Sequence, residues 1–209
     1  MDQSFYKIIQ NANTVIIENI SGCQDHIERL TIIADNVGRN CKNLKLFFEG
    51  DEVDNVDLAK KYVEIFRKFE AVESIRIDAE GDGNLTNLAN EMMKDENFVW
   101  FSTVKTFKCY AGFGIKNPLA LQTLFTKFKN ADTFKGIIFD NFNPLELFES
   151  KGKKIRNLSW SIPENQAVRE IILKFISFDE PEALKISGGW EQKAELEGLV
   201  IPGVRHLYI

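Results

Sequence analysis

The sequence contains few of the residues on which metal sites, disulfide frameworks and nucleic-acid binding depend. Its 209 residues include two histidines and three cysteines, and Cys23, Cys41 and Cys109 lie far apart. Such spacing implies neither a disulfide framework nor a C-x-x-C metal site. The formal net charge of −5 argues against a general nucleic-acid binder, which would carry a basic surface. With 44% hydrophobic and 27% charged residues, the composition is that of a globular protein.

The chain also lacks the apolar segments that lead proteins into or across membranes. Its first ten residues, MDQSFYKIIQ, contain no basic region followed by an uninterrupted apolar stretch. No segment approaches the ~18 consecutive apolar residues of a spanning helix. We therefore expect no membrane association and a reducing setting, either cytoplasm or nucleus.

Catalytic signatures are missing as well. His26 and His206 are the only histidines, and no nucleophile-elbow, zinc-protease or P-loop motif is present. The segment Asp78–Leu85, DAEGDGNL, imitates the opening of a calcium loop, but Ala89 stands at the twelfth position, where a bidentate glutamate is needed. An acidic, glycine-rich turn is the better interpretation. The sequence thus predicts no cofactor, no metal site and no enzymatic activity.

What the sequence does contain is a recurring strand pattern, clearest in Phe134–Leu145, FKGIIFDNFNPL. Apolar residues stand at first, fourth and sixth positions, and the fourth and sixth point to the same side of a strand. Successive first positions lie 21 to 32 residues apart, which indicates a repeat architecture. The eight occurrences are Ala12/Val15/Ile17, Cys41/Leu44/Leu46, Val72/Ile75/Ile77, Val104/Phe107/Cys109, Phe134/Ile137/Phe139, Ile155/Leu158/Trp160, Pro181/Leu184/Ile186 and Val204/Leu207/Ile209.

The intervals between these strands have helical periodicity. Ser21 is predicted to cap the first helix and Asn55 or Asp54 the second, and Asn84 or Thr86 is predicted to open the third. Asn-Pro or Pro starts open three more, at Asn117, Asn143 and Pro163.

This alternation predicts an α/β solenoid with parallel strands on the concave face and helices on the convex face. We expect one array over residues 1–209, with about seven to eight repeats. The last predicted strand ends at Ile209 without a polar cap. Hence we expect a longer natural chain or a partner at that end, and possible self-association through the edge strand.

The strand signature resembles that of leucine-rich repeats of the ribonuclease-inhibitor-like kind over almost the whole chain. The asparagine or cysteine expected three places after the sixth position is absent, and Phe142 stands there in the clearest unit. An irregular array of this kind is common in substrate receptors of ubiquitin ligases. More narrowly, Ile186–Ile209 looks like the end of the F-box-associated homology domain of nematode F-box proteins. No F-box itself is found in this sequence.

The candidate site is the predicted concave face. Lys45, Arg76 and Lys108 are expected side by side, because parallel strands lie ~4.8 Å apart. Adjacent like charges destabilise a sheet unless they are neutralised, and arginine with aromatic residues is typical of binding hot spots. The alternative is that Glu18, Asp78 and Asp140 neutralise the row. The predicted partner-binding residues are Lys45, Phe47, Arg76, Asp78, Lys108, Tyr110, Ile138 and Asp140.

These features favour a non-catalytic protein–protein interaction module, for which substrate recognition in an F-box-type ubiquitin ligase adaptor is the leading hypothesis. The predicted partner is a protein with an acidic segment, not a nucleic acid. Two alternatives stay open. One is an antidote or inhibitor that holds a single stable protein partner. The other is a small-molecule enzyme on a doubly wound α/β sheet, in which ligands bind beyond the strand carboxyl ends.

Overall fold

The protein has an α/β fold with parallel strands, in which strands and helices alternate along the chain. It is described here by a computed structural model. The chain forms two compact units: unit 1 comprises Met1–Lys105 and Tyr110–Asn130, and unit 2 comprises Thr106–Cys109 and Ala131–Ile209. The structure describes residues 12–20, 22–48, 55–79, 85–111, 123–124, 126–138, 155–161, 182–187 and 205–208.

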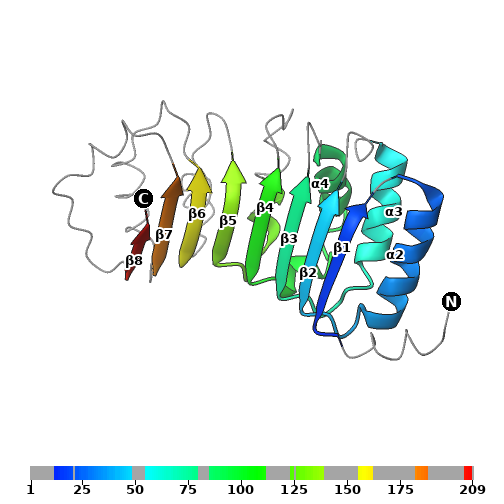
Figure 1. Cartoon of the computed structure of the whole chain (residues 1–209), viewed down its shortest axis with the longest axis horizontal. Coiled ribbons are helices and arrows are strands. Elements are labelled where there is room, and N and C mark those ends of the chain that lie inside the picture. The colour runs from blue at the N-terminus through cyan, green and yellow to red at the C-terminus, as the bar shows by residue number, and fades with distance from the viewer. Residues whose placement is uncertain are drawn as a thin grey trace. The chain divides into compact units, whose positions relative to one another are not determined.

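In unit 1 three parallel strands are ordered as they are in the chain (Figure 1). They are β1 (Thr14–Ile20), β2 (Asn43–Phe48) and β3 (Ser74–Ala79). Alternate side chains are buried along each strand, and in β2 and β3 the intervening ones are half-buried or exposed. Because side chains alternate between faces, one face is packed by helices, and we call the other the open face. Ile16, 51% exposed, lies on the open face of β1.

Four helices are described, all in unit 1: α2 (Gln24–Val37), α3 (Val56–Phe66), α4 (Thr86–Met93) and the one-turn α5 (Trp100–Thr103). In Figure 1, α2, α3 and α4 lie together beside β1–β3, and their buried residues recur at helical spacing. The cap prediction for α3 is confirmed, since the Asn55 side chain accepts hydrogen bonds from the Asp57 and Leu58 amides at 2.8 and 3.4 Å.

The predicted start of the first helix is wrong. α2 begins at Gln24 with Cys23 at its N-cap, and no side chain caps it. Ser21 lies outside the described residues. At the third helix the predicted opening at Thr86 is confirmed, since Thr86 is the first residue of α4, and Leu85 occupies the N-cap position, again without a side-chain bond. Both helices are therefore held by packing of their apolar faces more than by their caps.

The core of unit 1 contains a chain of touching aromatic rings. Trp100 is fully buried, stacks on Phe66 at 5.3 Å between ring centroids, and meets Phe98 edge-on at 5.2 Å. Its indole N–H donates to the Phe69 carbonyl at 3.0 Å, which satisfies the only polar atom of the side chain. The one-turn helix α5 thus places the Trp100 side chain in the core. The rings run Phe48, Tyr62, Phe66, Trp100, Phe98, Phe101 and Phe128.

Close packing between the end of α2 and the turn after α3 requires a glycine. Gly38 ends α2 with right-handed helical dihedrals. A Cβ atom built there would lie 2.3 Å from the Lys68 carbonyl oxygen and 2.5 Å from that of Ala34. Both atoms are backbone, so no side-chain movement could make room.

Unit 2 contains five further strands, again parallel and in chain order. They are β4 (Thr106–Ala111), β5 (Thr133–Ile138), β6 (Asn157–Ser161), β7 (Ala183–Ser187) and β8 (His206–Tyr208). Strand β4 is divided between the two units, with Thr106–Cys109 in unit 2 and its last two residues in unit 1. Among the described residues, the strands stand where the sequence pattern placed them except in one case.

That case is the fifth strand, whose predicted frame Phe134/Ile137/Phe139 is wrong. Phe134 pairs with Phe107, the fourth residue of the preceding pattern, so Ala131 is the first position and Phe134 the fourth. Both are buried, at 2% and 0% exposure. The register then shifts between Lys135 and Ile137, after which Ile137 is level with Trp160. This irregularity between Lys135 and Ile137 explains why two frames fit the same sequence.

A row of charges that the sequence analysis did not single out runs along the amino ends of the strands. At successive occurrences of the strand pattern, the carbonyl oxygen of the residue after the first position accepts hydrogen bonds from backbone N–H groups of the next strand. Lys42 accepts them from Glu73 and Ser74 at 2.9 Å. The side chains that follow the first positions alternate in sign. In unit 1 Glu73 pairs with Lys42 at 3.5 Å and with Lys105 at 2.8 Å. We call the sets Lys42–Glu73–Lys105 and Asp132–Arg156–Glu182 the ion-pair ladders.

Candidate functional site

The open face of unit 1 brings together four of the predicted site residues. In the register of β2 and β3, Lys45 is level with Arg76 and Phe47 is level with Asp78. All four are half-buried. The sheet ladder therefore holds a cation pair and an aromatic–carboxylate pair in adjacent rows, as predicted.

Arg76 is the centre of this group. Its Nε lies 3.0 and 2.9 Å from the two Asp78 carboxylate oxygens, and its Nη2 lies 2.7 Å from Oδ2. The guanidinium also stands 5.5 Å from the centre of the Phe47 ring, a cation–π contact. Asp78 is the more buried partner, with a side chain 13% exposed against 37% for Arg76. Within unit 1, Asp78 thus neutralises one member of the basic row.

Lys45 differs from Arg76 in this respect. Among the described residues, no acidic side chain lies within ion-pair distance of it. Glu18 is exposed on β1. The alternative prediction was that acidic residues neutralise the basic row. Within the described part of the chain, it holds for Arg76 and does not extend to Lys45.

In unit 2 the register changes the membership of the basic row. Lys108 is level with Lys135, which the sequence analysis overlooked because of the misplaced frame. Ile138, predicted to lie level with Lys108, is instead level with Ser161, one row farther along the strand. The side chain of Tyr110 and the whole of Asp140 lie outside the described residues. The sequence signal that could have revealed Lys135 is a charged residue directly after the apolar Phe134.

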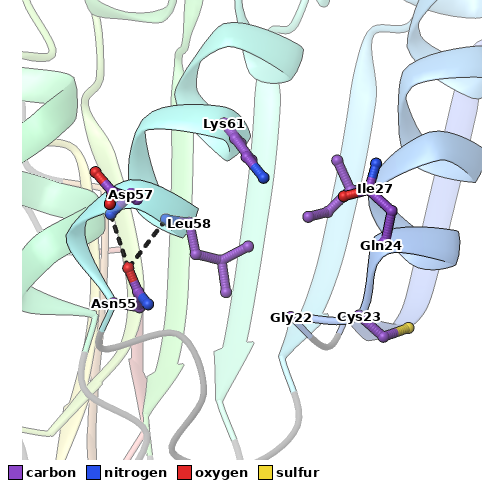
Figure 2. A pocket seen from close by; sticks show the side chains of 8 residues that line it. All are labelled: Gly22, Cys23, Gln24, Ile27, Asn55, Asp57, Leu58 and Lys61. Atoms are coloured by element: carbon purple, nitrogen blue, oxygen red, sulfur yellow. Dashed lines mark hydrogen bonds between the residues drawn. The ribbon is translucent and has the colours of Figure 1, made fainter.

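An open depression of about 640 Å³ lies between the amino-terminal ends of α2 and α3. Figure 2 shows Ile27 and Leu58 from the two helices with Cys23, Gln24 and Lys61 around them. The Asn55 carboxamide oxygen is turned to the α3 amides it caps. The sequence analysis gave no indication of this depression, whose residues come from two separate helix starts.

Among the described residues, two groups have displaced pKa values, and burial or ion pairing accounts for each shift. Burial raises the pKa of the Cys41 thiol to about 11, although its Sγ lies 3.3 Å from the Asn43 carbonyl oxygen. The Glu73 pKa is lowered, first by the hydrogen bond from Lys105 and then by the charges of Lys105 and Lys42. Cys41 is thus a neutral core thiol, and Glu73 is a structural carboxylate.

No cluster of three or more histidine, cysteine, aspartate or glutamate side chains that could hold a metal ion occurs in the described part of the chain. Within the same residues, no helix is both long enough and apolar enough to cross a membrane. No protein-family model matches the chain, and no curated protein matches it in sequence.

Proposed function

We propose that the protein is a non-catalytic protein–protein interaction module that binds its partner through the open face of the sheet. The observation that carries this proposal is the group Phe47, Arg76 and Asp78 on that face. An aromatic ring under a guanidinium that a carboxylate already orients is a rigid, partly exposed anchor, the kind of residue set on which binding hot spots depend.

The architecture supports the same proposal. Strand order that follows chain order within each unit is what a leucine-rich-repeat-like solenoid requires. Such an array would present the open face as its concave binding surface and its helices as the convex side. The specific role we favour is substrate recognition in an F-box-type ubiquitin ligase adaptor in the cytoplasm or nucleus. It depends on the resemblance of Ile186–Ile209 to the F-box-associated homology domain.

The two alternatives make different demands on the molecule. An antidote or inhibitor that holds one stable partner would use the same face, and only the partner's identity separates it from an adaptor. An enzyme on a doubly wound sheet needs helices on both faces. Lys45, Phe47 and Arg76 are half-buried, not covered, which favours the binding module.

The experiment is capture of the native partner by the purified full chain, followed by substitution on both faces. We expect Phe47→Ala to weaken partner binding by about 2 kcal/mol and Arg76→Glu by roughly 1 kcal/mol. Matched controls come from α2: Ile32→Ala, at a side chain 38% exposed, and Arg29→Glu, at an exposed cation. Equal losses from both faces, or losses only from the α2 variants, would move the partner to the helices.

A further inference from the structure

The open face of unit 1 holds an exposed apolar side chain and a lysine at the same level of the sheet. Ile16 on β1 is the register partner of Lys45 on β2. Among the described residues, Ile16 is the most exposed large apolar side chain, at 51%, against 44% for Val56 and 38% for Ile32. The residues on either side of Ile16 in β1 are buried, so the strand fixes the Ile16 side chain on the open face.

Lys45 stands between Ile16 and Arg76 in this row and is half-buried. The charge of Arg76 is held by Asp78, whereas within the described residues no acidic side chain lies within ion-pair distance of Lys45. Other lysines of the described part do form ion pairs, namely Lys42, Lys60, Lys68, Lys94 and Lys105. An exposed apolar side chain alone is ordinary, but here it adjoins a cation that the described part of unit 1 does not neutralise.

The next row along the strands adds an aromatic ring and limits the local charge. Phe47 is half-buried and lies two residues beyond Lys45 on β2, so it is the diagonal neighbour of Ile16. One bulky apolar side chain of a partner can therefore contact both. Two carboxylates border the group: Glu18, exposed on β1, and Asp78, whose side chain is 13% exposed.

We propose that the open face of unit 1 recognises a carboxylate side chain next to a bulky apolar side chain on one segment of the protein partner. The carboxylate pairs with Lys45, and the apolar side chain packs on Ile16 and Phe47. Level positions on adjacent strands lie ~4.8 Å apart, a spacing that suits neighbouring side chains of a single segment. The charge of the occupant follows from complementarity to Lys45. This inference rests on the proposed function and specifies the chemistry of its partner.

A phosphate group is a less favoured anion for this position. It has a charge of roughly −1.5 to −2 at neutral pH and would meet Glu18 and Asp78 in the same patch. A carboxylate has the single charge that matches Lys45. A nucleic acid is opposed further by the net charge of −5 on the whole chain.

The test begins with selection by the immobilised full chain from random peptides displayed on phage. We expect enrichment of peptides in which glutamate or aspartate adjoins leucine, isoleucine or phenylalanine. An enriched peptide, synthesised with blocked ends and a fluorescein label, should bind at least tenfold more tightly than its glutamine analogue. Blocking both ends leaves only side-chain carboxylates to account for that preference.

Variants then assign the two contacts. Lys45→Met removes the charge but keeps an unbranched apolar stem, so it should bind the parent peptide and the glutamine analogue equally. Lys45→Glu should prefer the analogue with lysine in place of the acid. Ile16→Ala should weaken binding of the parent peptide roughly threefold to tenfold. The controls Arg29→Glu and Ile32→Ala, both on exposed positions of α2, should leave it unchanged. A thermal melt of each variant verifies folding.

Several outcomes would overturn the inference: no enrichment of acidic peptides, a glutamate preference that survives in Lys45→Met, or equal losses from Ile16→Ala and Ile32→Ala. Tighter binding of a phosphoserine analogue or of an oligothymidylate would also overturn it. Failure of the proposed function gives a different result. If Lys45→Glu and Ile16→Ala bind the native partner normally while Phe47→Ala does not, the open face still binds protein and only this assignment is wrong. If none of the three affects partner binding, the proposed function is wrong as well.

Discussion

Two charged rows cross the strands of this protein, and they are built in opposite ways. Along the amino ends, Lys42, Glu73 and Lys105 alternate in sign and pair across adjacent strands. In unit 2, Lys108 and Lys135 have the same sign and stand level with each other on adjacent strands. Alternating charges on neighbouring strands stabilise a sheet, and like charges destabilise it. The comparison teaches that the row along the amino ends stabilises the sheet through its own ion pairs, whereas the two level lysines do not stabilise it through each other.

The largest expected loss of unfolding free energy comes from the buried face of unit 1, and the effects expected in the two charged rows are compared with it. Trp100→Ala should lower the free energy of unfolding by ~3–5 kcal/mol, since it opens a cavity beside Phe66 and Phe98. Trp100→Phe keeps most of the volume but leaves the Phe69 carbonyl without its donor, which should cost about 1–3 kcal/mol. Urea unfolding measures both. Near-parental stability of Trp100→Ala would mean that the ring chain is not the core of unit 1.

Glu73→Lys tests the paired row directly. It would place three cations level with one another at positions 42, 73 and 105, where the parent has two ion pairs. We expect a lower melting temperature than the parent, by less than Trp100→Ala causes, because these side chains are 40% or more exposed. The difference in melting temperature should shrink in 1 M salt, where the Debye length is only ~3 Å. A salt-independent loss would point to a steric cause instead.

Much of the fold follows from the sequence, for reasons that the structure makes plain. Buried residues alternate in β2 and β3, so an apolar pattern of period two located those strands. The fifth strand was misplaced because Ala131/Phe134 and Phe134/Ile137 satisfy the same pattern, and a register shift between Lys135 and Ile137 leaves no signature in the pattern. The Ser21 cap failed because α2 begins without any side-chain cap.

The candidate site was predicted less completely. The sequence correctly placed Lys45 level with Arg76, because the pattern positions in their two strands were assigned correctly. Lys135 was missed only because the pattern positions in the fifth strand were assigned wrongly. The Arg76–Asp78 pair was foreseen only as an alternative, since sequence spacing does not say which acid turns toward which base. The ion-pair ladders had a readable signal, because every position from Lys42 to Glu182 after a first position is charged.

The converse substitution in the like-charge row should not destabilise the protein. Lys135→Glu converts a like-charge neighbour of Lys108 into an opposite one. We expect the free energy of unfolding to stay within about 0.5 kcal/mol of the parent or to rise, as for a surface position outside the core. Chemical denaturation of the parent and the variant in low salt measures it. Clear destabilisation would show that Lys135 contributes to folding, and the contrast between the rows would no longer hold.

The smallest expected effect concerns the pH dependence of the paired row. Lys105 and Lys42 lower the Glu73 pKa in the folded protein, so the unfolded chain binds a proton at Glu73 at a higher pH than the folded chain does. The stabilisation is therefore fully present above the ordinary glutamate pKa and is lost as pH falls through the lowered value. Glu73→Gln should melt slightly below the parent at pH 7, and the gap should close as the pH falls through the lowered Glu73 pKa. Because Glu70 is exposed and on no ladder, Glu70→Gln serves as the control and should show no such gap. A gap that persists at acid pH, where Glu73 is protonated, would mean that Glu73 stabilises the fold by packing or hydrogen bonding, not by its charge, and the paired row would lose its distinction from the like-charge row.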